Sequence, residues 1–110
     1  MVIKQGSILL MDLSPKQGHE QSGKRPYLYL SYKGVEKYAH IAVFSPISTT
    51  KRRYPLYQEL PAASQTKGVV MLDQLVTIDY HNRPFHYLEQ LPDDYMEKIL
   101  KIVKVVFQKD

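Results

Sequence analysis

Short apolar runs separated by polar stretches make up most of the chain. The first run, residues 7–13, is almost continuously apolar and is bounded by Gly6 and by Ser14-Pro15. A run of that length between such residues is typical of a buried strand. Comparable runs predict further strands at residues 27–31, 38–44, 54–60, 68–72 and 75–80. The pattern therefore predicts a mainly β protein of about six short strands.

The stretches between these runs are predicted to be turns and loops, because glycine, proline and polar residues dominate them. They comprise a long loop at 16–24, a turn around Gly34 at 33–37, a polar loop at 45–53, a loop or single helical turn at 61–67, and irregular chain at 81–87. Long ordered loops are often functional, which draws attention to the first of them.

The last part of the chain changes to helical periodicity. Apolar residues recur at helical spacing at Met96, Ile99, Leu100, Val103, Val106 and Phe107. Pro92-Asp93-Asp94 supplies a helix start with acidic residues in the first turn. We expect one amphipathic helix whose apolar stripe on residues 96–107 packs on the sheet and does not form a dimer seam.

Composition narrows the class of protein. The 110 residues fit a single domain, and 15 Lys and Arg against 11 Asp and Glu give a net charge of +4, a mild bias compatible with a polyanionic partner. The absence of cysteine excludes disulfides, thiol chemistry and a Cys-bearing zinc site. The first residues lack the apolar core of a signal peptide, and no apolar run approaches the ~20 residues of a membrane span. We therefore expect a cytoplasmic protein with no membrane segment.

The segment 18–26 holds the most unusual chemistry of the chain. It combines a carboxylate, a carboxamide and a guanidinium with two glycines. Pro26 fixes the backbone torsion after Arg25, and the guanidinium offers a planar fork of donors suited to two phosphate oxygens. Glu20 either pairs with Arg25 and orients it or serves as a general base. From residue types alone, a surface loop with an ordinary Glu–Arg ion pair is the commoner arrangement.

Short motifs of fixed spacing follow one another along the chain. They are Gln5-Gly6-Ser7-Ile8, Asp12-Leu13-Ser14-Pro15, Gly18-x-Glu20-Gln21-x-Gly23-x-Arg25-Pro26, Pro46-Ile47-Ser48-Thr49, Tyr54-Pro55, Asp73-Gln74 and Thr77-Ile78-Asp79. By these motifs the chain resembles the MazF/PemK family of toxin endoribonucleases from bacterial toxin–antitoxin pairs. The resemblance extends over residues 3–106, which is nearly the whole chain.

The resemblance implies a compact SH3-like barrel with a C-terminal helix, of the CcdB/MazF-like type, and a symmetric homodimer. It also implies cleavage of single-stranded RNA without a metal ion or other cofactor. In that reaction the ribose 2′-hydroxyl attacks the adjacent phosphate and leaves a 2′,3′-cyclic phosphate and a 5′-hydroxyl. The implied protein partner is a cognate antitoxin of the MazE/PemI type, whose acidic tail blocks the RNA groove.

The catalytic residues implied by the resemblance are Arg25, Ser48 and Glu20. Arg25 matches the family's catalytic arginine, and we assign it to stabilising the phosphorane. Ser48 stands where the family has its catalytic threonine, so the hydroxyl is kept and a methyl group is lost. Glu20 either orients Arg25 or acts as the base. The structural alternative is that Ser48 and Thr49 only cap a turn.

RNA contacts are expected around these residues. The run Lys51-Arg52-Arg53-Tyr54 combines three cations with an aromatic ring, which suits a phosphate track beside a base-stacking platform. A solvated charge run is its plainer interpretation. The complete set of candidate RNA-binding residues is Lys16, Gln17, His19, Gln21, Thr49, Lys51, Arg52, Arg53 and Tyr54.

Other functions remain open at this point. A CcdB-like toxin would bind DNA gyrase and cut nothing, and a barrel that had lost its activity would only bind RNA or a partner. The Arg25/Ser48 pair with its basic flank favours cutting. His81 and His86 are five residues apart without a carboxylate motif between them, so surface histidines are favoured over a metal site or a catalytic pair.

Overall fold

The computed structural model describes residues 2–13 and 23–110. The segment 14–22 lies outside this part of the chain. The predicted site residues that fall there are Lys16, Gln17, His19, Glu20 and Gln21, and the structure says nothing about them.

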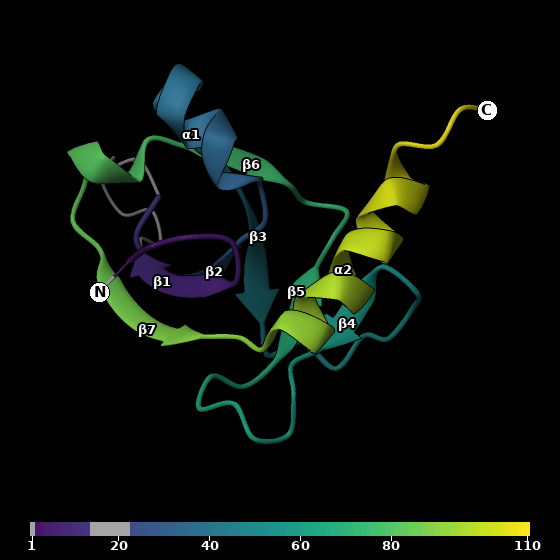
Figure 1. Ribbon diagram of the computed structural model, residues 1–110. Coiled ribbons are helices and arrows are strands. Elements are labelled where there is room, and N and C mark those ends of the chain that lie inside the picture. The colour runs from purple at the N-terminus through teal and green to yellow at the C-terminus, as the bar shows by residue number, and fades with distance from the viewer. Residues whose placement is uncertain (1, 14–22) are drawn as a thin grey trace, which may run out of the picture.

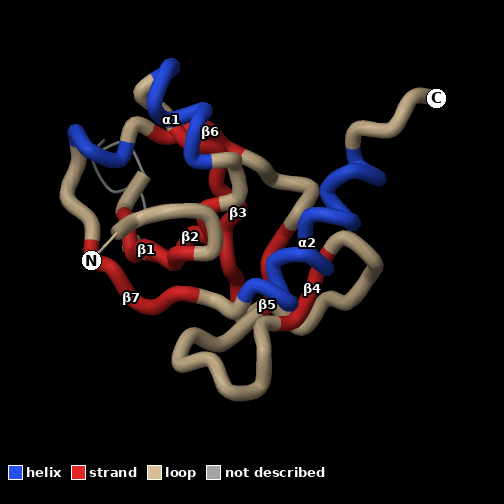
Figure 2. The backbone as a smooth tube through the Cα atoms, viewed as in Figure 1, coloured by secondary structure: helices blue, strands red, loops and turns tan. Residues whose placement is uncertain are grey.

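The described residues form one antiparallel sheet of seven strands, and a helix follows the last strand at the C-terminal end of the chain (Figures 1 and 2). The strands are β1 (Ser7–Met11), β2 (Arg25–Tyr29), β3 (Ala42–Ser48), β4 (Tyr57–Glu59), β5 (Val69–Met71), β6 (Val76–Ile78) and β7 (His86–Gln90). Their order in the sheet is β4-β5-β3-β2-β1-β7, with β6 also paired to β3. The prediction of a mainly β fold with a C-terminal helix is confirmed.

Both faces of the sheet are covered, which explains why the strand sequences are almost continuously apolar. Successive residues in a strand point to opposite faces. Ile8 and Leu28 belong to one buried cluster, together with Met96 and Ile99 of the C-terminal helix. Their neighbours in the chain, such as Leu9, belong to a second cluster on the other face. Because neither face is left to water, the usual alternation of apolar and polar residues is absent.

The C-terminal helix α2 (Asp93–Val106) lies beside β4 and β5 (Figure 1). Its Met96 and Ile99 are buried, and Ile102 and Val103 pack against the same cluster, so the apolar stripe does pack on the sheet. Phe107 departs from this expectation, because it lies just past the helix and is 70% exposed.

Two predictions for the segment 33–44 are wrong. A helix, α1 (Lys33–Ala39), replaces the turn expected at 33–37 and includes residues 38 and 39, the start of the strand expected at 38–44. The intrinsic helix or strand propensity of these residues is a weak guide, and contacts with distant parts of the chain favour the helix. The carboxylate of Glu36 accepts hydrogen bonds from the hydroxyls of Tyr29, at 2.7 Å, and Tyr80, at 2.6 Å, which fasten α1 to the sheet.

Strand β3 consequently begins at Ala42 and continues to Ser48, through part of the segment expected to be a loop. A loop was expected over 45–53 because polar residues dominate that segment, yet Pro46, which lacks a backbone donor, lies within β3. One edge of β3 pairs with β6 over Ala42–Phe44 and with β5 over Ile47–Ser48. Pro46 falls in the gap between these two partners, where no bond to either of them is lost.

The segment 81–87 contains more regular structure than expected. A short 3₁₀ turn covers Tyr80–Asn82, and β7 begins at His86 and pairs antiparallel with β1. The residues of β7 are exposed or partly buried, so their sequence carries no clear strand pattern. Over residues 2–13 and 23–110, no helix has the length and apolar character that crossing a bilayer requires.

The Glu36 carboxylate allows a test of how α1 is held. Burial alone would raise the pKa of Glu36, but hydrogen bonds from Tyr80, His81, Tyr29 and Lys33 together outweigh it and lower the pKa from 4.5 to about 2. A lowered pKa means that the charged form stabilises the fold above pH 4.5, and that this stabilisation is lost as the pH falls towards about 2.

We predict that Glu36→Gln lowers the free energy of unfolding at neutral pH, by on the order of 3 kcal/mol. The gap between variant and wild type should shrink as the pH falls below 4.5, the ordinary pKa of the group. Urea unfolding followed at several pH values measures it. Glu97→Gln, at an exposed position on α2, is the control and should change little. A gap that stays constant down to about pH 2.5 would contradict the assignment.

Candidate active site

The pairing of β2 with β3 brings Arg25 and Ser48 together. Tyr27 is directly opposite Pro46 in this antiparallel pair, and Arg25 and Ser48 each lie two residues further towards the same end of the sheet. Residues that face each other across an antiparallel pair project to the same side of the sheet. Two motifs that are 23 positions apart in the sequence therefore meet at one end of the sheet.

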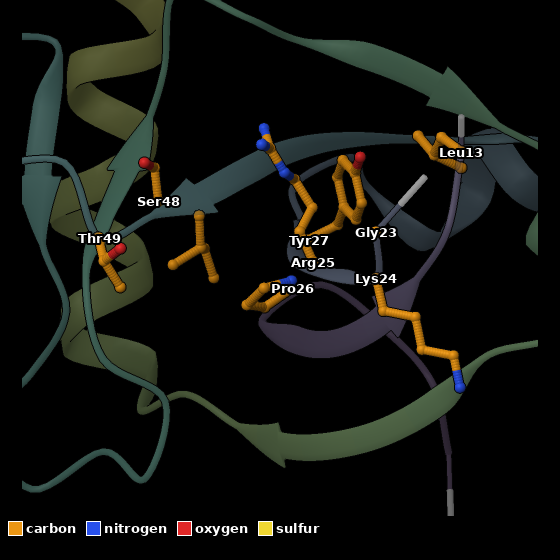
Figure 3. A pocket seen from close by; sticks show the side chains of 9 residues that line it. Leu13, Gly23, Lys24, Arg25, Pro26, Tyr27, Ser48 and Thr49 are labelled. Carbon is orange, nitrogen blue, oxygen red and sulfur yellow. The ribbon is translucent and has the colours of Figure 1, made fainter. Parts of the chain in front are cut away.

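Arg25 and Ser48 line one pocket of about 650 Å³ (Figure 3). Figure 3 shows Arg25 and Tyr27 side by side on β2, Ser48 across from them at the end of β3, and Lys24 directed away from Arg25. The remaining lining residues are Leu13, Gly23, Pro26, Ile47 and Thr49. Ile47 is buried and Arg25 is exposed, so a cationic group stands at the solvent side of a partly apolar hollow.

The hydroxyl of Ser48 has one fixed partner. Its Oγ accepts a hydrogen bond of 3.1 Å from the backbone N–H of Thr50. The turn-capping interaction considered from the sequence is therefore present, and it occurs at the wall of the pocket. A hydroxyl that accepts one bond still has a hydrogen to donate. The cap and a role towards a bound phosphate are thus compatible.

Tyr27 is a pocket residue that sequence reasoning missed. Its side chain is only 7% exposed, and burial raises the pKa of its hydroxyl, although the positive charge of Arg25 opposes the rise. The phenol is therefore protonated at neutral pH, beside the guanidinium. A signal was available, because residues two apart in a strand share a face and Tyr27 follows Arg25 by two.

The basic run after Ser48 is more ordered than a solvated charge run. The guanidinium of Arg52 lies 4.6 Å from the ring centre of Tyr54 and 5.5 Å from that of Tyr57. The Nε of Arg53 is 3.3 Å from Oε1 of Glu59, and its Nη1 donates to the carbonyl oxygens of Thr50 and Arg52. Arg53 thus braces the loop, while Arg52 is stacked on aromatic rings.

The motif Asp73-Gln74 supports this stack from the turn between β5 and β6. Asp73 accepts a hydrogen bond from the Tyr54 hydroxyl, and the Gln74 amide donates to the Tyr57 hydroxyl at 3.3 Å. The sequence contained Asp73-Gln74 as a motif but gave no indication of these partners.

The predicted site residues thus divide into groups. Arg25, Ser48 and Thr49 share the pocket, whereas the run 51–54 forms the adjacent loop and does not line it. His81 contacts Glu36 at 3.0 Å, while His86 lines a separate small cavity with Lys24, so these histidines do not act as a pair. Within the described ranges, no three His, Asp or Glu side chains gather as a metal site would require.

Comparison with known proteins identifies the family of the chain. The family of PemK-like, MazF-like toxins of type II toxin–antitoxin systems matches the chain over residues 4–107. Endoribonuclease EndoA of Bacillus subtilis is 28% identical over 110 residues, covering 96% of this chain and 94% of its own. Endoribonuclease PemK of Escherichia coli is 31% identical over 102 residues, covering 89% and 77%.

Solved structures give the same result. A chain in the MazE–MazF crystal structure from Deinococcus radiodurans superposes with a TM-score of 0.84 at 26% identity, covering 97% of this chain and 96% of that one. MazF alone from the same organism gives 0.79, also at 26% identity, with 97% of both chains covered. The match over residues 4–107 and the likeness in fold establish that this chain belongs to the PemK-like, MazF-like family of toxins of type II toxin–antitoxin systems.

Proposed function

We propose that this chain is a toxin endoribonuclease that cuts single-stranded RNA at specific sequences without a metal ion. The observation that carries the proposal is that Arg25, at the start of β2, and Ser48, at the end of its partner β3, line one pocket. Membership of the family and the names of the relatives, which are endoribonucleases, support it.

In the proposed reaction the 2′-oxygen of a ribose attacks the adjacent phosphorus, and the bond from phosphorus to the 5′-oxygen breaks. The 2′-hydroxyl gives its proton to a base, and the leaving 5′-oxygen takes one up, which yields a 2′,3′-cyclic phosphate and a 5′-hydroxyl. Arg25 binds the non-bridging oxygens of the phosphorane through its fork of donors. Ser48 donates its hydroxyl hydrogen to one of the same oxygens, and Glu20 either orients Arg25 or accepts the 2′ proton.

The loop at 50–54 is proposed to bind the flanking nucleotides. One face of the Arg52 guanidinium is stacked on Tyr54, so its other face is available for a base. Lys51 adds a phosphate contact, whereas Arg53 mainly shapes the loop. Thr49 in the pocket, with Lys16, Gln17, His19 and Gln21, completes the proposed RNA-binding set.

The proposed regulator is a cognate antitoxin. The crystal structure of MazE–MazF from Deinococcus radiodurans contains the toxin with its antitoxin. An acidic tail on such a partner would complement the exposed Arg25 and the basic loop beside it. We also propose that the chain works as a homodimer in the cytoplasm.

A first test needs only the purified protein and a long RNA. We predict that it cuts single-stranded RNA in excess chelator at a small set of sequence sites, and that the new ends are a 2′,3′-cyclic phosphate and a 5′-hydroxyl. Mapping the ends by primer extension gives both the activity and the recognition sequence. Activity that disappears with chelator and returns with a metal ion would rule out the metal-free mechanism.

The second test removes the guanidinium. We predict that Arg25→Ala lowers kcat by at least about a hundredfold, as is common when one donor to a developing oxyanion is lost. The variant should unfold at nearly the same temperature as wild type, because Arg25 is exposed. Lys101→Ala, which removes an exposed cation from α2, controls for lost charge and should cut normally. Normal cutting by Arg25→Ala would refute the site assignment.

The third test concerns the serine. Ser48→Ala removes the donor and should lower kcat by about tenfold to a hundredfold. Ser48→Thr keeps the hydroxyl and restores the residue that the family carries, so it should cut at least as fast as wild type. Single-turnover rates on the mapped RNA site measure both. An alanine variant as fast as wild type would show that Ser48 only caps the turn.

A further inference from the structure

Gly68, the residue just before β5, packs directly on the backbone of Ser48. A Cβ added at this position would overlap the carbonyl oxygen of Ser48, and would lie 2.9 Å from its carbonyl carbon and 3.3 Å from Cγ2 of Ile47. Gly68 also has a φ of +126°, which residues with side chains rarely adopt. Two independent constraints therefore favour glycine here: the positive φ of the backbone and the close contact with Ser48, a residue of the pocket.

This contact joins the start of β5 to the end of β3. On one side, Gly68 leads into Val69 and Val70, which are fully buried, and its carbonyl accepts a hydrogen bond of 3.2 Å from the N–H of Leu60. On the other side, Ser48 is the last residue of β3 and is followed by exposed positions, beginning with Thr49. Ser48 pairs with Val69 at the end of the β3–β5 ladder, so a side chain at position 68 would press on that last pair and on the carbonyl of Ser48 within it.

We infer that Gly68 is a positioning residue for the active site, an inference that rests on the proposed function. Its bare backbone lets β5 approach the end of β3, and this contact sets where the Ser48 hydroxyl stands relative to Arg25. Arg25 is on β2, on the far side of β3 from β5, so pressure at position 68 reaches Ser48 first. Gly68 touches no substrate and acts only through Ser48.

A change at Gly68 is therefore expected to affect the rate of RNA cleavage and not the binding of RNA. The cations proposed to bind RNA are exposed: Arg25 is on β2, and Lys51 and Arg52 are on the loop after β3, where Arg52 lies over the rings of Tyr54 and Tyr57. Displacing the Ser48 hydroxyl leaves them in place but takes a donor away from the phosphorane. Misplacing a catalytic group by about 1 Å can cost about a hundredfold in rate. The expected signature is a loss in kcat without a matching change in KM.

The experiment compares Gly68→Ala with wild type on the mapped RNA site. We expect kcat to fall by about tenfold to a hundredfold while KM stays within about twofold. Gly6→Ala is the matched control, because Gly6 also has a positive φ, of +96°, and an added Cβ there would overlap Nε2 of the Gln90 side chain. It strains the fold away from the pocket and should leave kcat unchanged.

A double-mutant comparison tests the route through Ser48. If Gly68 acts on Ser48, Gly68→Ala should cost little further activity once Ser48→Ala has removed the hydroxyl. Losses that multiply in the double variant would overturn the inference, and so would equal values of kcat for wild type and Gly68→Ala. Wild-type protein that does not cut RNA would instead refute the proposed function, which keeps the two failures distinct.

Folding is checked on the same samples. If Gly68→Ala is unfolded at the assay temperature, the measurements are repeated in the cold with trimethylamine oxide, an osmolyte that favours the folded state. A variant that folds there with a low kcat and an ordinary KM supports the inference. A variant that stays unfolded while Gly6→Ala folds makes Gly68 a residue needed for folding and overturns it.

Discussion

The hydrogen-bonded pairing of β2 with β3 is the constraint on which the candidate site depends. Its register, with Tyr27 opposite Pro46, is what brings Arg25 and Ser48 to the same end of the sheet. Because side chains alternate along a strand, a slip of one residue would turn one of them to the other face. The apolar residues of both strands resist such a slip, since Leu28 and Phe44 are fully buried in clusters on opposite faces. The core thus specifies the geometry of a site that is itself largely exposed.

Much of this arrangement was predictable from the sequence, because the residues that carry it are sequence-local. The strands expected at 7–13 and 27–31 are found at Ser7–Met11 and Arg25–Tyr29, and the helix expected around 96–107 is found at Asp93–Val106. Arg25 and Ser48 were identified by resemblance, and only the strand pairing brings them together. Whether Glu20 orients Arg25 stays a prediction, since it lies outside the described residues.

The failures have a common physical cause, which is that long-range contacts decided the structure. Helix α1 is held by Tyr29 and Tyr80, which are 7 and 44 positions away from Glu36, and no local pattern reveals them. Strand β7 exists because β1 offers it a partner, although its own residues are half-exposed. The support that Asp73 gives to Tyr54 likewise joins residues 19 positions apart.

The break at Pro46 divides β3 into two stretches with different neighbours along one edge. The first stretch is tied to β6 and α1, and the second to β5 and thereby to β4. No backbone hydrogen-bonded ladder on that edge runs through the proline, and beside it the buried hydroxyl of Ser45 donates to the carbonyl oxygen of Met71 at 2.6 Å. Ser48 is in the second stretch, so on this edge the wall of the pocket is hydrogen-bonded to β5, whereas α1 and β6 are attached to the part of β3 that precedes the proline.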